Sequence, residues 1–231
     1  MKERILFESD ELIVVNKTGG EPAVKDLTED VSLLEKIQKQ LNISVYPLHR
    51  IDRPVSGAVM FAKSKKAAAF YSSEFKERRV QKVYLAATAD KPSSQKGKIE
   101  GWLKSSAKKS KAYFSETPVK NGKKASALYS VVDQIDNYFL LALQLETGRH
   151  HQLRAQLSYI NCPAKGDVKY GARRKNTDRS IHLHAYLLAF NDENSNTTEK
   201  IIAPLPNDGV WNAFDLSKLT AAIDDENNLI I

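Results

Sequence analysis

The segment His49-Arg50-Ile51-Asp52-Arg53-Pro54-Val55-Ser56-Gly57 places one carboxylate between two guanidinium groups. Pro54 disfavours a helical conformation at the residue before it, and the apolar run 58–62 that follows is typical of a buried strand. Asp52 is therefore expected on a loop at the entrance to a strand, where a side chain can reach a ligand. The flanking arginines favour the ionised carboxylate and would attract a polyanion. An isolated Asp–Arg pair is more often a structural ion pair, so this segment alone does not define a site.

A second motif, Glu146-Thr147-Gly148-Arg149-His150-His151-Gln152-Leu153-Arg154, is followed closely by Gly166-Asp167. Together with the first segment it resembles the RluA-type RNA pseudouridine synthases, whose signatures read His-Arg-Leu-Asp-x-x-Thr-Ser-Gly and Thr-Gly-Arg-x-His-Gln-Ile-Arg. Shorter matches at Lys82-Val83-Tyr84-Leu85-Ala86 and Leu183-His184-Ala185 follow in the family's order. The chain departs from the pattern at Val55, where the family has threonine, and after Lys17, where the usual proline is missing.

The resemblance implies an α+β fold with a long, bent, largely antiparallel sheet, flanking helices and a central cleft. It implies one catalytic domain over residues 1–231, with no amino-terminal domain of the S4 type. It also implies that a uridine in ribosomal or transfer RNA is converted to pseudouridine. That reaction breaks the N1–C1′ bond and joins C5 to C1′ without redox change, so neither a cofactor nor a metal is expected.

The resemblance also assigns roles to single residues. Asp52 matches the catalytic carboxylate, Arg154 its basic partner, and Tyr84 the tyrosine that stacks on the target uracil. Arg50 matches an arginine that fills the space left when the target base leaves its stack. We further expect RNA contacts from the nearby side chains of Arg53, Lys63, Arg149 and His151.

The composition of the 231-residue chain is that of an ordinary globular protein, with 42% hydrophobic and 27% charged residues and a net charge of +7. The basic side chains gather at residues 63–82 and 104–124, which favours RNA as the partner. No apolar run is long enough to span a membrane, and the start does not resemble a signal peptide. Cys162 has no cysteine to pair with, so we expect a buried thiol and a cytoplasmic protein. No obligatory protein partner is expected.

Periodicity predicts the elements that position these residues. Short apolar strands are expected at 5–7 and 12–15, and further strands at 80–88, 127–132, 138–145 and 181–190. Ser32 with Glu35 predicts a capped helix, Ser64 predicts a second one, and the motif ending at Arg154 should continue into a third. Residues 91–97 and 191–198 are expected to be loops or hairpin tips.

Two alternatives compete with this interpretation. Five histidines together with Asp52 and Asp167 suggest a metal-dependent phosphoesterase, in which His182-x-His184 would place two rings on one face of a strand. The arginines beside Asp52 argue against a cation there. The second alternative is a non-catalytic RNA-binding protein that retains the fold, which the basic composition fits equally well.

Overall fold

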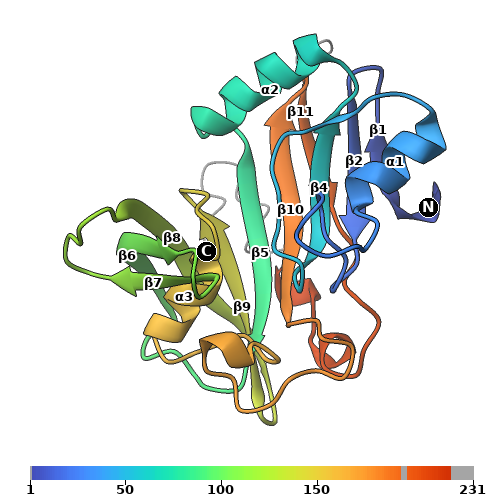
Figure 1. Ribbon diagram of the computed structural model, residues 1–231. Helices are drawn as coiled ribbons and strands as arrows, with labels where there is room; N and C mark the ends of the chain where they lie inside the picture. The colour runs from blue at the N-terminus through green and yellow to red at the C-terminus, as the bar shows by residue number, and fades with distance from the viewer. Residues whose placement is uncertain (1, 194–196, 220–231) are drawn as a thin grey trace. The chain divides into compact units, whose positions relative to one another are not determined.

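The structure is a computed structural model that describes residues 2–193 and 197–219. The chain divides into two compact units, each built from two stretches of sequence (Figure 1). Unit 1 comprises Met1–Lys82 and His184–Pro206, and unit 2 comprises Val83–Leu183 and Asn207–Ile231. Each unit is described by itself below.

The sheet of unit 1 has the order β1-β2-β4-β10, with β3 paired to β4 and β11 paired to β10. Its strands are β1 (Ile5–Glu8), β2 (Leu12–Lys17), β3 (Tyr46–Pro47), β4 (Ser56–Ala62), β10 (Leu183–Asn191) and β11 (Thr198–Ile202). Neighbouring strands are antiparallel except β4 and β10, which are parallel and pair at Ser56–His184 and Gly57–Ala185. Strand β4 is buried along its whole length, as its apolar sequence predicts.

Two helices complete unit 1, and both begin as the sequence predicts. Helix α1 (Leu33–Leu41) starts at a capping box, in which Ser32 and Glu35 bond each other's backbone N–H groups. Helix α2 (Lys65–Lys76) starts at Ser64, whose hydroxyl accepts the Ala67 N–H at 3.0 Å. The buried face of α2 packs with apolar side chains of β2, β4 and β10 in one core.

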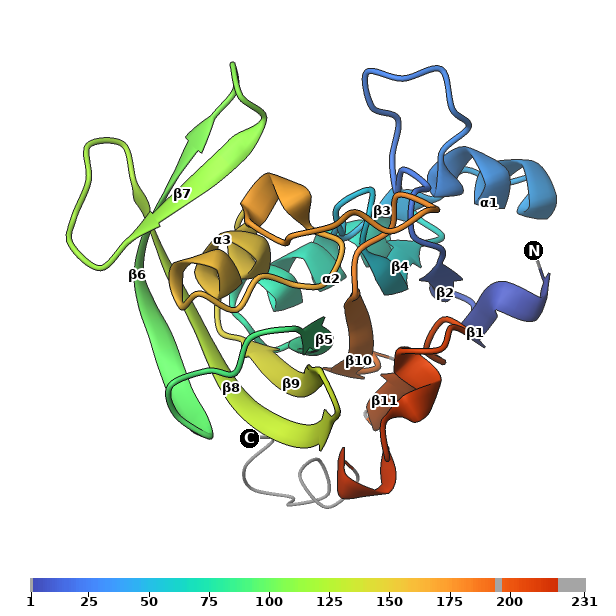
Figure 2. The same ribbon diagram turned by 90° about the horizontal axis from the view of Figure 1, so that it is seen from below.

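Unit 2 is built on the strand order β5-β9-β8-β6-β7, in which every pair is antiparallel. The strands are β5 (Gln81–Thr88), β6 (Lys96–Ser106), β7 (Lys111–Ser115), β8 (Lys123–Ile135) and β9 (Tyr138–Leu145). Helix α3 (Gln152–Tyr159) lies against the curved face of β6 and β8 (Figure 2). Its Gln156 side chain donates to the Ile99 carbonyl at 2.7 Å, which ties the helix to β6.

The predicted α+β class, the strands centred on apolar runs and all three helices are confirmed. The sequence interpretation missed β3, β6, β7 and β11, and it placed Lys96 and Gly97 in a loop although they begin β6. Only alternate residues of β6, such as Ile99 and Leu103, are buried, while lysines and serines fill most other positions. The buried thiol expected at Cys162 is confirmed, and burial raises its pKa to about 11. No helix in the described residues is long and apolar enough to cross a membrane.

Candidate active site

Asp52 lies on a turn directly before β4, as the first motif predicts. The turn is closed by the Val55 N–H, which donates to the Asp52 carbonyl at 3.0 Å. It is tied to the segment after β2 by two bonds of 2.8 Å, from the Gly20 N–H to the Arg53 carbonyl and from Arg53 Nε to the Gly20 carbonyl. The half-buried carboxylate of Asp52 therefore projects from backbone that is fixed on both sides.

Lys17 is the central support of this turn. Its side chain is 0% exposed, and its ammonium donates to the carbonyls of Thr18, Glu21 and Arg53 at 2.9, 2.7 and 3.0 Å. Three carbonyls match the three protons of an ammonium group. Burial lowers the pKa of Lys17 to about 7, so the fold retains this lysine at a cost in solvation. No role for Lys17 was predicted from the sequence; the available signal was a lysine at the end of a strand that begins with four apolar residues.

The start of β4 is anchored by β10. Ser56 Oγ lies 2.7 Å from His184 Nδ1, and His184 Nε2 lies 3.1 Å from the Ala203 carbonyl. A carbonyl only accepts, so Nε2 carries the proton and Nδ1 accepts the serine hydroxyl. Burial lowers the pKa of His184 to about 4, which keeps the ring neutral. Gly57 has φ +114°, and a Cβ there would lie 2.3 Å from the Ala185 carbonyl oxygen, so no larger residue fits between the strands.

The expected RNA-binding side chains of unit 1 differ in their surroundings. Arg53 forms ion pairs with Asp26 and Asp30, and Lys63 forms one with Glu8 at 2.7 Å. Arg50 is exposed, and within the described residues no carboxylate lies in ion-pair distance of it. An RNA phosphate could therefore bind Arg50 directly. To bind Arg53 or Lys63, it would have to displace the carboxylate that each of them pairs with.

Arg154, on α3 in unit 2, is 5% exposed and held from several directions. Its Nε and Nη2 donate to the two carboxylate oxygens of Asp167 at 2.7 and 2.8 Å, and its guanidinium lies over the Tyr170 ring at 4.9 Å. Nη1 lies 3.1 Å from His151 Nε2. The sequence interpretation gave Asp167 no role in binding Arg154, although the glycine-aspartate pair belongs to the second motif.

His151 is buried beside this arginine. Because a guanidinium only donates, Nε2 of His151 accepts, and the ring proton lies on Nδ1, 2.9 Å from the Tyr170 hydroxyl. The same hydroxyl accepts the Ala112 N–H at 2.8 Å. An RNA contact by His151 would require one of these bonds to open. Arg149 is exposed, with Nε donating to the Lys124 carbonyl at 3.2 Å.

Tyr84 lies on β5, opposite Leu143 of β9, and is mostly buried. Asp52 thus belongs to unit 1, and Tyr84 and Arg154 belong to unit 2.

The two histidines of the His182-x-His184 pair, which suggested a phosphoesterase, have other partners. Both ring nitrogens of His184 are hydrogen-bonded within unit 1, as described above. His182 contacts Asn176 through Nδ1 and Asp208 through Nε2. Asp167, another of the proposed ligands, binds Arg154. His182, His184 and Asp167 are therefore engaged in other contacts and do not form a shared metal site.

Comparisons with known proteins agree with the motifs. Residues 11–159 match the model of the RNA pseudouridylate synthase family. The chain is 32% identical to tRNA pseudouridine synthase C of Haemophilus ducreyi, over 91% of this chain and 93% of that protein. It is 33% identical to ribosomal large subunit pseudouridine synthase D of Borreliella burgdorferi, over 98% of this chain and 71% of that protein.

The fold also matches a solved structure, human RNA pseudouridylate synthase domain containing 1. That match has a TM-score of 0.78 at 24% identity and covers 96% of this chain and 94% of the human one. The family match over most of the chain decides between the three interpretations. The chain belongs to the RluA-type RNA pseudouridine synthases and is an RNA-modifying isomerase.

Proposed function

We propose that this chain isomerises a uridine in structured transfer or ribosomal RNA to pseudouridine, with Asp52 as the catalytic carboxylate. The observation that carries the proposal is the fixed turn of Asp52, which is bonded to Lys17 and Gly20 and continues directly into β4. Catalysis needs a reacting group held in one geometry before substrate arrives. The names of the relatives from Haemophilus ducreyi and Borreliella burgdorferi support transfer and ribosomal RNA as the substrate classes.

In the proposed reaction the N1–C1′ bond of uridine breaks, the uracil turns, and a C5–C1′ bond forms. C5 loses its proton and N1 gains one, so the composition of the RNA is unchanged. Asp52 acts on the ribose, either by attacking C1′ or by assisting removal of a ribose proton. A covalent step of the first kind would divide one difficult bond exchange into two easier ones.

Arg154 is the proposed cationic partner of Asp52. Asp167 and His151 take three of its five N–H donors. We assign the other donors to the carboxylate of Asp52. A planar guanidinium that Asp167 holds in place can orient the Asp52 carboxylate through paired hydrogen bonds. Tyr84 is proposed to stack on the target uracil after the base leaves the RNA helix, at a cost of a few kcal/mol. Arg50, Arg53, Lys63, Arg149 and His151 are proposed to contact the RNA around it.

The test is Asp52→Asn, assayed on total RNA from cells that lack this gene, with pseudouridine measured by mass spectrometry of nucleosides. We expect product to fall below detection while affinity for RNA stays within a few-fold, because the variant removes a charge that phosphates repel. Asp10→Asn is the matched control, since Asp10 is an exposed carboxylate of unit 1, and it should behave like the parent. Pseudouridine formation by Asp52→Asn at the parent's rate would refute the role of Asp52. A parent protein that binds RNA but never forms pseudouridine in any of these RNAs would refute the proposed substrate classes.

A further inference from the structure

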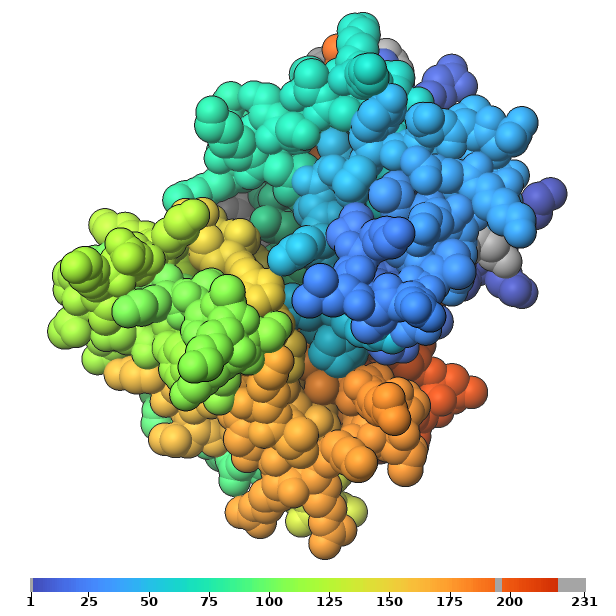
Figure 3. Space-filling view, viewed as in Figure 1, coloured from blue at the N-terminus to red at the C-terminus, as the bar shows by residue number. Residues whose placement is uncertain are grey.

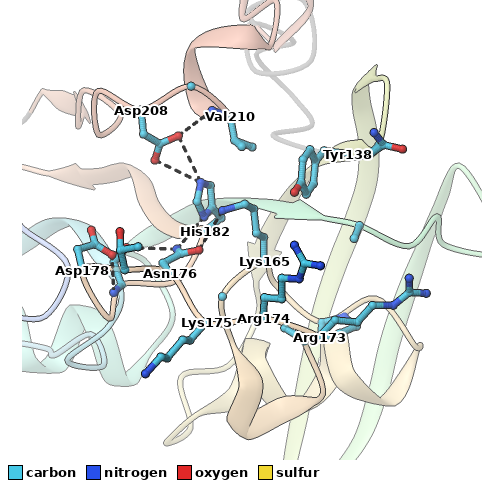
Figure 4. A pocket seen from close by; sticks show the side chains of 18 of the residues that line it. Tyr138, Lys165, Arg173, Arg174, Lys175, Asn176, Asp178, His182, Asp208 and Val210 are labelled. Carbon is cyan, nitrogen blue, oxygen red and sulfur yellow. Dashed lines mark hydrogen bonds and ion pairs between the residues drawn. The ribbon is translucent and has the colours of Figure 1, made fainter.

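A cavity of about 820 Å³ in unit 2 is not explained by the proposed catalytic residues. It is lined by the loop between Lys165 and His182, by Tyr138 at the start of β9, and by Asp208 (Figure 4). The loop carries six lysine or arginine and two aspartate side chains, in a chain whose net charge is +7. It therefore holds much of the excess positive charge of the protein, in a segment that neither basic cluster of the sequence analysis included.

The two ends of this loop are bonded to each other and to β5. The His182 N–H donates to the Lys165 carbonyl at 2.8 Å, and the Lys165 N–H donates to the Ala87 carbonyl at 2.8 Å. The Ala87 N–H in turn donates to the His182 carbonyl at 3.0 Å. The loop is thus closed at its base, so its basic side chains project from defined backbone.

A chain of side-chain hydrogen bonds crosses the cavity wall (Figure 4). Lys165 Nζ donates to Asn176 Oδ1 at 2.9 Å, and Asn176 Nδ2 lies 3.0 Å from His182 Nδ1. Because Lys165 can only donate, the amide oxygen faces it and the amide nitrogen donates to His182. His182 Nε2 then donates to Asp208, 3.2 Å away, and Asp208 also accepts the N–H groups of Val210 and Trp211 at 2.9 Å. Burial lowers the pKa of His182 and favours this neutral ring.

Gly166 completes the wall. It has φ +90°, and a Cβ at this position would lie 2.8 Å from the side chain of Asn176. The glycine therefore lets Asn176 lie flat on the backbone, where it joins Lys165 to His182. The polar chain is built into the fold, and it fixes Asn176, which directly follows the segment 173–175 in the sequence.

The charges at the mouth of the cavity are largely uncompensated. Arg173, Arg174 and Lys175 are exposed, on the part of the surface drawn in orange in Figure 3. Arg173 lies 3.9 Å from Asp90, and within the described residues no carboxylate lies in ion-pair distance of Arg174 or Lys175. The other carboxylates of the lining are engaged: Asp178 accepts from Ser180 and Asp208 from His182.

The basic cluster at 63–82 has a different environment. Lys63 pairs with Glu8 at 2.7 Å, Lys66 lies 4.0 Å from Glu193, and Arg79 pairs with Glu74 and Glu77. Those side chains are neutralised by the fold itself. In the loop at 165–182, by contrast, Arg174 and Lys175 have no such carboxylate partner within the described residues.

We propose that Arg174 and Lys175 bind backbone phosphates of the RNA substrate, with Tyr138 at the opposite wall of the cavity. Guanidinium groups match phosphate oxygens in pairs, and exposed cations bind a polyanion by releasing its counterions. This inference rests on the proposed function for the choice of RNA. It adds a binding site in unit 2 whose phosphate-binding side chains, Arg174 and Lys175, lie outside both motifs.

The test compares the double variant Arg174→Gln/Lys175→Gln with Lys39→Gln/Lys200→Gln. The control removes the same charge from two exposed lysines of unit 1, for which no ion pair is found within the described residues. RNA affinity is measured at several salt concentrations in the Asp52→Asn background, so the result does not depend on turnover. We expect the Arg174/Lys175 variant to bind roughly tenfold more weakly, with the slope of log Kd against log salt reduced by about 2.

With Asp52 restored, KM for the RNA should rise and kcat should stay within about twofold, as expected when a contact is equally strong in ground and transition states. Binding and KM indistinguishable from those of the control variant would overturn the inference. A cavity that serves a small nucleotide would give a different pattern: UMP would raise the melting temperature of the parent but not of the Arg174/Lys175 variant, while RNA affinity stayed unchanged. That pattern would also overturn it. Loss of pseudouridine formation alone concerns the proposed function and leaves the binding result intact.

Discussion

Tyr84 illustrates how one side chain can serve a site in two chemically separable ways. The proposed stacking uses its ring, and any proton transfer would use its hydroxyl. Its place on β5, opposite Leu143 and mostly buried, also fits a purely structural tyrosine. Substitution can therefore distinguish the three roles.

We expect Tyr84→Phe to bind RNA like the parent and to turn over more slowly, because only the hydroxyl is lost. Tyr84→Leu should lose stacking as well, worth about 1–3 kcal/mol per base, and so be weaker in both binding and turnover. Single-turnover rates and RNA affinities measure the two effects separately. If Tyr84→Phe reacted at the parent's rate, the hydroxyl would have no part in proton transfer.

Asp167 is a residue that the sequence interpretation left without a function. We expect Asp167→Asn to lower kcat at least tenfold with a smaller change in KM, because Arg154 loses the carboxylate that fixes both Nε and Nη2. Leaving a buried charge without its partner typically costs about 3–5 kcal/mol, so the melting temperature should also fall.

Asp133→Asn is the matched control for that variant. Asp133 is a buried carboxylate of unit 2 that pairs with Lys218 and accepts the Asp215 N–H, outside both motifs. It should lose stability and keep its kcat. If both variants lost stability and neither lost kcat, Asp167 would be structural and not a positioning residue.

The sequence located Asp52 on its turn and Arg154 on its helix, because each lies inside a contiguous motif. It did not reveal that Lys17 supports the first or that Asp167 binds the second. Those contacts join residues 36 and 13 positions apart, and no local pattern records such a pairing.

At the scale of elements, the junction of β2 with the Asp52 turn is the point where the fold determines the site. Lys17 ends β2, and its ammonium reaches the Arg53 carbonyl, so strand and turn move together. The same turn continues into β4, whose first residues pair with β10.

We expect Lys17→Met to fold with reduced stability and to turn over slowly even when it is folded. The variant keeps the length and burial of the side chain and removes the donors of three carbonyls, each worth roughly 1 kcal/mol. The test measures kcat at a temperature well below the melting temperature of the variant. The control is Lys82→Met, which replaces the lysine beside Phe75. A folded Lys17→Met enzyme with the parent's kcat would show that the support is dispensable.

Apolar periodicity predicted the elements whose burial is continuous, such as β2 and β4, and those with clear caps, such as α1 and α2. It failed for β6, β7 and β11. These strands carry many polar residues. The pairing of β6 with β8, of β7 with β6 and of β11 with β10 compensates for their weak apolar patterning. The parallel pairing of β4 with β10 has no local signature, because the partners are more than 120 residues apart.

At the scale of the whole molecule, buried neutral histidines make stability depend on pH. The pKa of His184 is about 4 in the folded chain, below its ordinary value of 6.5, because of burial. Desolvation also lowers the pKa of the half-buried His49 to about 3, and its Nε2 accepts the Met60 N–H at 3.0 Å. The folded chain therefore binds these protons more weakly than the unfolded chain does.

We expect the resulting stability to be complete above about pH 6.5 and to decrease as the pH falls toward 4, because protons then favour the unfolded chain. For His184 alone, the difference between 6.5 and about 4 corresponds to roughly 3 kcal/mol at the acid end. Urea unfolding at pH 7 and pH 5 measures it. Between pH 7 and pH 5, His184→Gln should lose less free energy of unfolding than the parent. A His150→Gln control should lose as much as the parent. Equal pH dependence in all three proteins would contradict the assignment.

The discontinuity of unit 1 has a consequence for the synthesis of the protein. The strand that anchors the Asp52 turn, β10, begins more than 120 residues after it, at Leu183, and the Ala203 carbonyl that fixes the His184 ring comes later still. A nascent chain on the ribosome therefore carries the whole first motif long before it can assemble the backbone around it. The enzyme should acquire activity only when residues near Pro206 have left the exit tunnel. An incomplete product of translation would then not modify RNA.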